Sequence, residues 1–260
     1  MKYHYIEQRI ASTQHKVTVN VIGAGGTGSH VLSSLAAMNH VLVSLGRQPL
    51  YVKVYDPDIV TETNIGRQTF SPADVGRYKA EVLVSRINKF YGVGWHSFCH
   101  KFGEGIKSEQ FWIYGANITI SCVDSVMSRH DIHGNLKNLA ACEKRTPAYA
   151  EPFYWMDIGN NAKSGQIILG TFGYINQPTK RNTVSSLPTF FDEYPDAMEN
   201  HDQPSCSMAE ALLRQDLFIN KIMATYAVQM LWDMLAHFRI TYRGMYINLG
   251  DGKTSRIPID

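Results

Sequence analysis

Residues Lys16–Gly28 read KVTVNVIGAGGTG, an apolar strand that runs directly into a glycine loop. The first seven residues alternate and are rich in β-branched side chains, which is typical of a strand. Gly23, Gly25 and Gly28 then follow at G-x-G-x-x-G spacing before Ser29 opens a long apolar helix. Such glycines permit a tight turn, approach of a phosphate to backbone N–H groups, and close packing of helix on strand. The stretch therefore predicts a nucleotide-binding loop, with a purely structural turn as the alternative.

Composition limits the classes of protein to which this chain can belong. Its 260 residues, 44% of them hydrophobic, favour one large α/β domain over two independent ones. The formal net charge of +2, without a run of basic residues, argues against nucleic-acid binding. No stretch approaches the roughly 18 apolar residues of a membrane span, and the N-terminus lacks the apolar core of a signal peptide. We therefore expect no membrane partner and a cytoplasmic location.

The thiols and the histidines do not suggest a metal centre. The four cysteines are Cys99, Cys122, Cys142 and Cys206. Because they form no C-x-x-C pair, they favour reduced thiols over a disulfide framework or a structural zinc. His130 and His133 are spaced for one helix face, but no third ligand lies within sequence reach. We expect these two histidines to face solvent and assign them no role.

A second strand is predicted over Leu50–Tyr55, and it ends at Asp56. In a doubly wound sheet, an acidic side chain at this position holds a ribose hydroxyl. Asp56 follows Gly28 by 28 residues, so the helix between them, or the loop after it, is longer than usual. The alternative is a simple turn, since Asp56 precedes a proline.

The polar segment 56–68 is followed by a capped helical turn at Ser71–Asp74 and by a helix from about Arg77 to Tyr91. This arrangement places Lys79 in the first helical turn, on the side where the strand ends open. For any one of these residues an exposed position in a solvated loop is the simpler interpretation. Their grouping favours a site.

Two more strands are predicted at Trp95–Phe102 and Asn117–Val123, the second ending in Asp124. The carboxyl ends of parallel strands converge on one crevice, where ligands bind. A carboxylate beside a nucleotide triphosphate is a suitable Mg²⁺ ligand, which predicts this role for Asp124. The structural alternative is that Asp124 caps the next helix, Ser125–Cys142.

The second half of the chain is less informative. Glu151–Gly173 has strand character, Tyr174–Pro204 is a long polar stretch, Ser207–Phe238 predicts a long helix, and Tyr242–Ile257 predicts a hairpin. The expected fold is a Rossmann-like, doubly wound, mostly parallel sheet with a C-terminal extension. One domain over 1–260 is expected, divided into a nucleotide-binding core, a connecting segment, and a long helix with a terminal hairpin, at 1–173, 174–206 and 207–260.

Taken together, the motifs resemble those of the superfamily of ThiF, MoeB and the ubiquitin-activating enzymes. They are Gly23-x-Gly25-Gly26-x-Gly28, Asp56-x-Asp58-x-Val60, Asn64-x-x-Arg67-Gln68, Gly76-x-x-Lys79-Ala80, and Cys122-x-Asp124 with Arg129. Within the superfamily, the sequence is most similar to the ThiF-type family of the plasmid cassette called PRTRC. The resemblance implies ATP-dependent adenylation of the C-terminal glycine of a small ubiquitin-like protein.

The resemblance also implies a role for each matching position. Asp56 would hold the ribose, and Asp124 would hold Mg²⁺. The residues expected to bind and polarise the phosphates are Asn64, Arg67, Gln68 and Lys79. No protein nucleophile or general base is needed, because the attacking carboxylate is already ionised near pH 7. The segment 174–206 would cross over the active site.

The resemblance also implies a homodimer and a thioester step. In the homodimer, Arg9 would complete the neighbouring subunit's ATP site. Cys206, just before the long helix, would accept the activated protein as a thioester, although a packing role is the simpler alternative. The alternative functions are a nicotinamide-dependent oxidoreductase, which the glycine loop and Asp56 alone would allow, and a catalytically silent nucleotide-binding scaffold.

Overall fold

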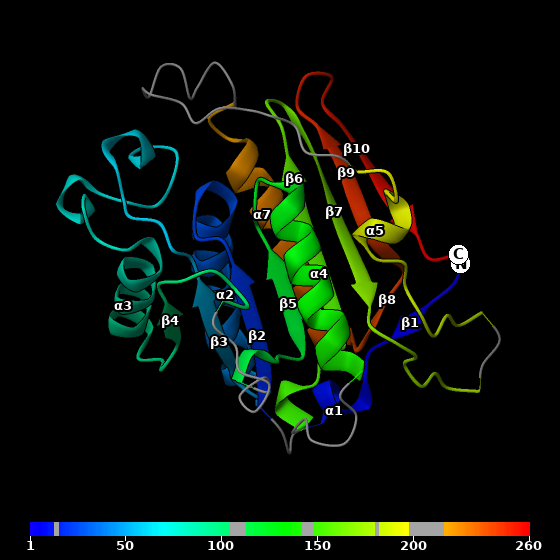
Figure 1. The fold of residues 1–260 in the computed structure, drawn as a ribbon. Coiled ribbons are helices and arrows are strands. Elements are labelled where there is room, and N and C mark those ends of the chain that lie inside the picture. The colour runs from blue at the N-terminus through cyan, green and yellow to red at the C-terminus, as the bar shows by residue number, and fades with distance from the viewer. Residues whose placement is uncertain (13–15, 105–112, 142–147, 180–181, 198–215) are drawn as a thin grey trace.

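A mixed sheet forms the centre of the protein (Figure 1). The computed structural model describes residues 1–12, 16–104, 113–141, 148–179, 182–197 and 216–260. Within these ranges the sheet has eight strands, in the order β10-β9-β7-β6-β5-β2-β3-β4. Their bounds are β2 (Val17–Ile22), β3 (Leu50–Tyr55), β4 (His96–Phe98), β5 (Ile118–Ser121), β6 (Tyr154–Asn160), β7 (Ser164–Thr171), β9 (Tyr242–Asn248) and β10 (Lys253–Pro258).

The parallel half of the sheet carries the first strand, β2, at its centre. β2 pairs in parallel with β3 on one side and with β5 on the other, while β4 and β6 extend the two sides. All residues of β2 and β5 are buried, as expected for strands covered on both faces. Because the chain leaves β2 toward β3 and returns to β5 on the opposite side, the sheet has a topological switch point between β2 and β5. This arrangement confirms the predicted doubly wound fold.

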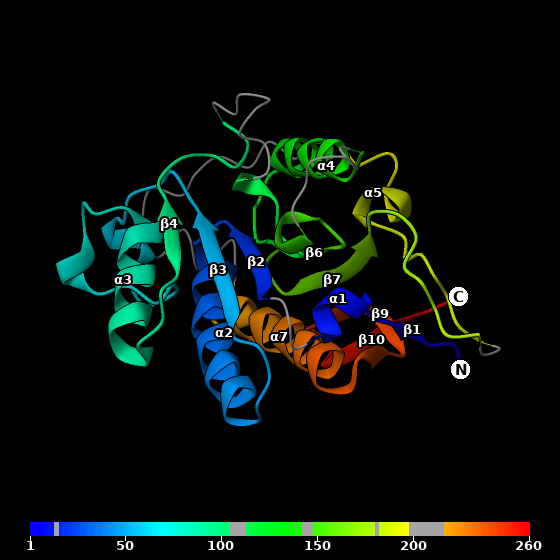
Figure 2. The same ribbon diagram turned by 90° about the horizontal axis from the view of Figure 1, so that it is seen from below.

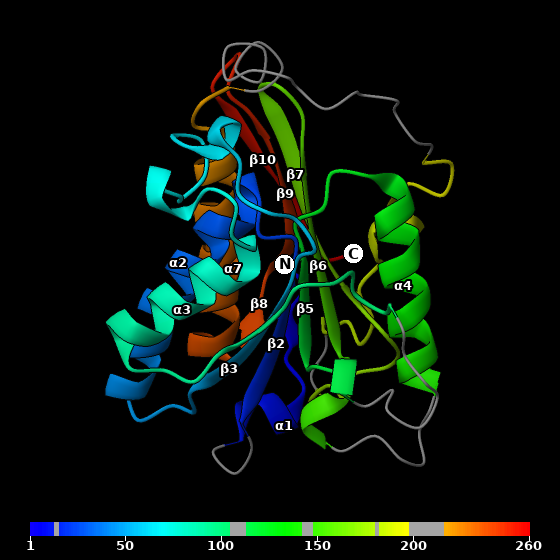
Figure 3. The same cartoon turned by 60° about the vertical axis from the view of Figure 1, so that its left-hand side comes forward.

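Helices cover both faces of the sheet, giving three layers (Figures 2 and 3). One face carries α2 (Gly26–Ser44), α3 (Lys79–Tyr91) and α7 (Ile219–His237), and the other carries α4 (Val126–Ala141) and the short α5 (Phe190–Glu193). The larger hydrophobic core lies under α2 and α7, with Leu32, Leu35 and Met223 at its centre. A short helix α1 (Gln8–Ala11) and a two-stranded sheet of β1 (His4–Tyr5) and β8 (Arg239–Ile240) complete the fold, together with 3-10 turns at Glu62–Asn64, Pro72–Asp74 and Ala148–Ala150.

The C-terminal part departs from the prediction at the start of its long helix. α7 begins at Ile219, whereas the helix was predicted from Ser207, which lies outside the described residues. The backbone N–H of Asp216 donates to the carbonyl of Ala162, and the Asp216 carboxylate accepts from the N–H of Phe218. These bonds hold residues 216–218 out of the helix. The predicted hairpin is confirmed as β9 and β10, and β9 adds it to the main sheet through β7.

The segment predicted to cross the active site is only partly described, in residues 174–179 and 182–197. This part lies beside β7 and near β1. The Thr171 N–H donates to the Leu187 carbonyl, and Thr183 forms a β-bridge with Tyr3. It ends in α5, next to α4 (Figure 2). Residues 198–215, which contain Cys206, lie outside the described residues, so both the crossing and the role of Cys206 stay predictions.

Candidate functional site

The glycine loop lies at the switch point of the sheet, between the ends of β3 and β5. The Gly23 N–H donates to the Tyr55 carbonyl at 2.9 Å, and the Cys122 N–H donates to the Ile22 carbonyl at 2.8 Å. Gly23 has φ of +90°, and a Cβ on it would lie 2.8 Å from the Cys122 oxygen. A Cβ on Gly28 would lie 1.8 Å from the Gly23 oxygen. Both positions therefore require glycine, because the turn is tight and the helix packs directly on the loop.

Helix α2 begins inside the loop, at Gly26, three residues before the predicted start at Ser29. Its first turn therefore contains the last glycines of the motif. The first backbone N–H groups of an α-helix have no partner within the helix, and the helix dipole favours an anion there. This is the geometry in which helix N-termini bind phosphate.

Asp56 holds the loop from the end of β3. It is 5% exposed, and its carboxylate accepts the N–H of Ala24 at 2.5 Å and the N–H of Asp58 at 2.8 Å. Burial raises the pKa of Asp56, while these two N–H groups and the nearby Lys79 oppose that rise. The bond to Asp58 is the turn contact considered as the simpler alternative, so Asp56 shapes the turn and the glycine loop together.

Lys79 stands at the first position of α3 and joins the same site. It is largely buried, and its ammonium donates to the exposed carboxylate of Asp58 at 2.8 Å. The prediction that Lys79 lies in the first turn of a helix facing the strand ends is confirmed.

The segment after β3 packs against the first turn of α2 and brings the Gln68 side chain to the loop. The Thr69 N–H donates to the Ser29 hydroxyl at 3.3 Å, and the His30 ring is hydrogen-bonded to the backbone of Arg67. A Cβ built on Gly25 would lie 4.0 Å from the Gln68 amide nitrogen. The predicted residue Gln68 thus lies beside the glycine loop, while the Arg67 guanidinium donates through Nη2 to the Thr63 carbonyl at 3.4 Å.

Three buried polar atoms on this segment have no hydrogen-bond partner among the described residues: Arg67 Nε, Gln68 Oε1 and Thr69 Oγ1. Leaving such atoms unsatisfied costs about 1 to 3 kcal/mol each, and native structures rarely do so without a reason. Burial also lowers the pKa of the Arg67 guanidinium. Arg67 Nε and the Thr69 hydroxyl are donors that can serve an anion near a helix N-terminus, whereas Gln68 Oε1 can only accept a hydrogen bond.

Asn64 occupies a different position from its predicted neighbours. It is buried at the end of a 3-10 turn, where its side-chain oxygen accepts from the N–H of Thr61 at 2.8 Å and from the Thr61 hydroxyl at 3.1 Å. This capping box stabilises the turn that leads into Arg67. In the structure described, the contacts of the Asn64 oxygen are therefore local ones.

Asp124 is exposed at the carboxyl end of β5, one residue after Val123, whose nitrogen is 3.5 Å from a Cβ built on Gly23. The alternative role of Asp124 as a helix cap is wrong. Ser125 caps α4 instead, because its hydroxyl oxygen accepts the N–H of Ser128 at 3.0 Å. The Asp124 side chain is therefore not used as the cap and is exposed just after β5.

A buried ion pair beneath Asp124 was not predicted. Arg129 Nε donates to both carboxylate oxygens of Asp157 at 3.0 Å, and Arg129 Nη1 donates to the Ser125 carbonyl at 3.3 Å. Ser121 donates to the same carboxylate at 2.6 Å and accepts from Trp155 at 2.7 Å. This network fixes the turn that carries Asp124. Two signals were available, because Arg129 belongs to the motif around Asp124 and Asp157 lies among the mainly apolar residues of β6.

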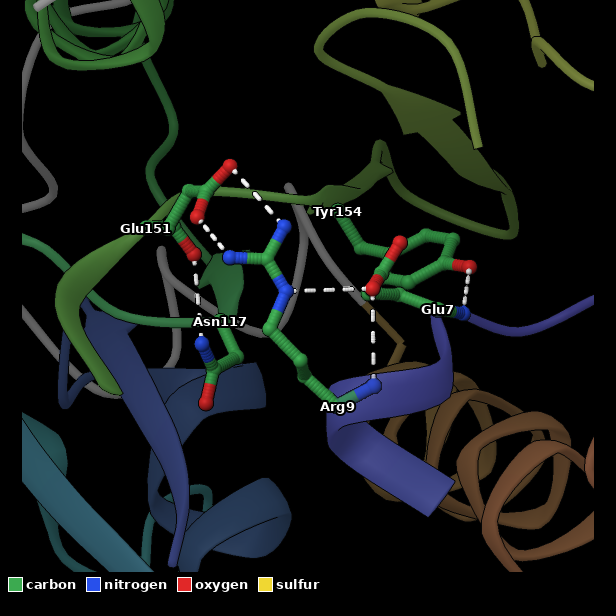
Figure 4. Close-up of polar contacts among 5 residues, drawn as sticks. All are labelled: Glu7, Arg9, Asn117, Glu151 and Tyr154. Carbon is green, nitrogen blue, oxygen red and sulfur yellow. Dashed lines mark hydrogen bonds and ion pairs between the residues drawn. The ribbon is translucent and has the colours of Figure 1, made fainter. Parts of the chain in front are cut away.

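Arg9 is held within its own chain (Figure 4). It forms an ion pair with Glu7 at 3.1 Å, a two-pronged contact with Glu151, and a stacking contact with the Phe153 ring at 4.7 Å. Helix α1 lies at the N-terminal ends of the parallel strands, and the glycine loop lies at their C-terminal ends (Figure 1). A role for Arg9 in the neighbouring subunit's site would require these contacts to be exchanged.

The two histidines on α4 differ from each other. His130 is exposed, and its ring stacks on Phe191 at 4.1 Å. His133 is half-buried against Trp155 and Phe172, and burial lowers its pKa, so its predicted solvent-facing position is wrong. No group of three or more metal-ligating side chains occurs among the described residues. The described helices include none with the length and apolarity of a membrane span.

Comparisons with known proteins agree on one family. The model of the ThiF family matches residues 6–255. The catalytic subunit of the NEDD8-activating enzyme E1 of Dictyostelium discoideum is 34% identical over 127 residues, which are 48% of this chain and 26% of that protein.

Solved structures share the fold at low sequence identity. PaaA is 17% identical with a TM-score of 0.58 over 97% of this chain and 65% of that chain. Escherichia coli MccB with ATP is 14% identical with a TM-score of 0.57, over 96% and 66%. MccB with AMPCPP and MccA is 15% identical with a TM-score of 0.58, also over 96% and 66%. The chain therefore spans about a quarter of the curated relative and about two thirds of the solved chains.

Proposed function

The chain belongs to the ThiF family, and from this membership together with the geometry of the crevice we propose that it is an ATP-dependent adenylating enzyme. The proposed reaction joins AMP to the C-terminal carboxylate of a small ubiquitin-like protein and releases pyrophosphate. The observation that carries the proposal is the set of unpartnered buried atoms on Arg67, Gln68 and Thr69 beside the glycine loop.

The site fits a nucleoside triphosphate in the chemistry of its groups. Phosphate oxygens would accept from Arg67 Nε and from the Thr69 hydroxyl, and the N-terminus of α2 would stabilise their charge. Asp56 would accept from a ribose hydroxyl with the lone pairs that Ala24 and Asp58 leave. Lys79, now bound to Asp58, would contribute its charge to the phosphates. A nicotinamide enzyme would leave Arg67 and Gln68 without a comparable role.

Asp124 is the proposed Mg²⁺ ligand. It is an exposed carboxylate at the end of β5, and Mg²⁺ commonly takes one or two carboxylates together with phosphate oxygens and water. A cluster of three protein ligands is therefore not needed. The bound cation would neutralise phosphate charge, while the Arg129–Asp157 pair keeps the turn before α4 in place.

The reaction balances without an acid, a base or a covalent intermediate on the protein. A carboxylate oxygen forms a bond to the α-phosphorus, the bond from that phosphorus to the oxygen of the leaving group breaks, and pyrophosphate departs with the electron pair. The carboxylate is already ionised, so no proton is removed. Arg67 and Lys79 act by bringing two anions together and by stabilising the charge on the leaving group, which is the main source of rate in such transfers.

The substrate class rests on the relatives. The names of the similar proteins include a NEDD8-activating enzyme and a complex of MccB with MccA. We propose a ubiquitin-like protein as the substrate, a homodimer as the assembly, the cytoplasm as the location, and the PRTRC cassette as the closest functional context. The proposal also includes a second step after adenylation, in which the Cys206 thiolate attacks the acyl carbon of the adenylate, the bond from that carbon to the phosphate oxygen breaks, and AMP leaves.

Two measurements test the proposal. ATP with Mg²⁺ should raise the melting temperature, whereas NAD should not. Exchange of labelled pyrophosphate into ATP should then depend on a protein or peptide with a free C-terminal carboxylate, and amidation of that carboxylate should abolish it. Arg67→Ala should lower this exchange. Arg77→Ala is its matched control, because Arg77 is exposed and is paired only with Glu81 among the described ion pairs. Stabilisation by NAD and not by ATP would refute the proposal.

A further inference from the structure

A buried asparagine on the C-terminal helix supports the glycine loop from behind. Asn220 is the second residue of α7 and is 2% exposed. Its side-chain oxygen accepts from the Thr27 hydroxyl at 3.0 Å, although the two residues are separated by 193 positions in sequence. Helix α7 packs alongside α2 in this region (Figure 3). The start of one long helix therefore touches the first turn of the other.

The same asparagine also explains the second glycine of the Gly25-Gly26 pair. A Cβ built on Gly26 would lie 2.6 Å from the Asn220 amide nitrogen and 2.8 Å from its side-chain carbon. A side chain at position 26 would have to displace the Asn220 amide, whose oxygen accepts from Thr27 and Asn160. This requirement is independent of any approach by a phosphate.

A third element completes the contact. Asn160, the last residue of β6, donates to the Asn220 oxygen at 3.4 Å, and its own oxygen lies 3.2 Å from the Thr27 hydroxyl. The N–H of Asp216 donates to the carbonyl of Ala162 at 2.8 Å, which ties the chain just before α7 to the turn after β6. The bond from Asn160 and the bond from Asp216 to Ala162 therefore hold Asn220 in place beside the glycine loop.

We propose that Asn220 is a positioning residue for nucleotide binding, which acts by holding Gly26 and Thr27 so that the first N–H groups of α2 keep their phosphate-binding geometry. The inference rests on the proposed function only where it concerns the nucleotide. Asn220 does not itself touch the substrate in this scheme. Its effect passes through the Thr27 hydroxyl and the backbone of Gly26, both of which lie in the first turn of α2.

An apolar residue of similar size would fill the same space but would leave the Thr27 hydroxyl with a weaker set of acceptors. Thr27 is 5% exposed, so water does not readily replace the lost partner. The first turn of a helix is also the part most prone to fraying, because it has the fewest internal hydrogen bonds. Loss of Asn220 should therefore loosen this turn before it affects the rest of α2.

The first experiment compares Asn220→Ala with Gln229→Ala. Gln229 is an exposed amide on the same helix whose described contact is with Asp233, which makes it a matched control. Without nucleotide, hydrogen exchange at the amides of residues 29–32, the first of which donates to the Gly25 carbonyl, should be about fivefold faster in Asn220→Ala, a change expected for the loss of about one hydrogen bond. Exchange in the middle of α7, at residues 223–231, should stay as in the wild type. Titration calorimetry with MgATP should give a Kd about tenfold weaker, while Gln229→Ala should stay within about twofold of the wild type.

A size exchange provides the second experiment. Gly26→Ala alone should weaken MgATP binding, because its Cβ meets the Asn220 amide. Asn220→Gly opens that space, so Gly26→Ala should weaken MgATP binding by a smaller factor in an Asn220→Gly background than in the wild type. Thr27→Val tests the hydrogen bond without changing the shape of the side chain, and it serves if Asn220→Ala does not fold.

The outcomes separate this inference from the proposed function. Unchanged amide exchange at residues 29–32 in both Asn220→Ala and Thr27→Val, with unchanged ATP affinity, would overturn the role of Asn220. If these variants exchange faster but the wild type binds no ATP, the result would support the positioning of the loop and would overturn the proposed function instead. If Gly26→Ala weakens MgATP binding by the same factor in the wild type and in the Asn220→Gly background, the steric account of Gly26 would be overturned.

Discussion

Raising the pH from neutral to about 9.5 should increase the free energy of unfolding through the buried amine of Lys53. The variant Lys53→Met should lack this part of the increase. Lys53 lies on β3 and is 8% exposed. Its ammonium donates to the carbonyls of Ile113 and Gly115, each at 2.7 Å, and no described carboxylate forms an ion pair with it. Burial lowers the pKa of Lys53 from 10.5 to about 8. The fold therefore holds a cation in a place that disfavours charge.

The sign and size of the effect follow from this pKa. Because the folded value lies below the unfolded value, the unfolded chain binds more protons between about pH 8 and pH 10.5, and stability rises with pH in that window. The full effect of the shift is about 3 kcal/mol, and going from pH 7 to pH 9.5 should recover about 2 kcal/mol of it. Lys53→Met also removes the donors to two carbonyls, but this loss is the same at both pH values.

The assay is urea unfolding followed by tryptophan fluorescence, at both pH values, for the wild type and Lys53→Met. The quantity of interest is the difference between the two proteins in their change of unfolding free energy with pH. Other groups that titrate in this range, such as Cys99, whose pKa burial raises, contribute equally to both proteins and cancel. The same pH dependence in both proteins would refute the assignment of a buried, charged Lys53.

Four other outcomes are expected. Arg67→Ala or Asp124→Ala should reduce pyrophosphate exchange by roughly a hundredfold without loss of fold, and normal exchange by either variant would remove that residue from the site. Asp157→Ala should lower the unfolding free energy in urea by about 3 to 5 kcal/mol, because it leaves a buried arginine unpaired; a loss below about 1 kcal/mol would contradict the buried pair. Light scattering should give a dimer rather than the 29.3 kDa monomer, and a monomer would also remove the role of Arg9 across an interface. Wild type with ATP and its protein substrate should form a thiol-sensitive adduct that Cys206→Ser lacks; an adduct on the variant would make Cys206 structural.

Local sequence patterns predicted the elements that depend on neighbours along the chain. The strand Val17–Ile22 and the turn that Gly23 allows follow from side-chain alternation and from a positive φ, which are both local properties. The start of α2 was placed at Ser29, where the apolar helical spacing follows the glycine motif. The structure begins the helix at Gly26, and the last glycines of the motif pack within its first turn on the loop and on Asn220.

Periodicity failed where a distant partner decides the outcome. It continued the last helix through residues 216–218, which a bond from Asp216 to Ala162 keeps non-helical. His133 was expected in solvent because no third metal ligand lay within sequence reach, although its ring packs against Trp155 and Phe172. Asp124 was a reasonable helix cap by its spacing, yet Ser125 takes that position. In each case several local solutions are similar in energy, and a contact from elsewhere in the fold selects one.

The sequence by itself determined the glycine loop, the alternation of strands and helices, and the residue types that accompany the loop, because strand ends, glycine turns and motif spacing are set within short stretches of chain. Only the tertiary structure decided which residues support the site. Asp157 and Asn220 are separated from Arg129 and Thr27 by 28 and 193 positions, and their partners are fixed by the order of strands in the sheet and by the packing of α7 on α2. Buried polar side chains are stable only when paired, and the pairing depends on which distant backbones the fold brings together.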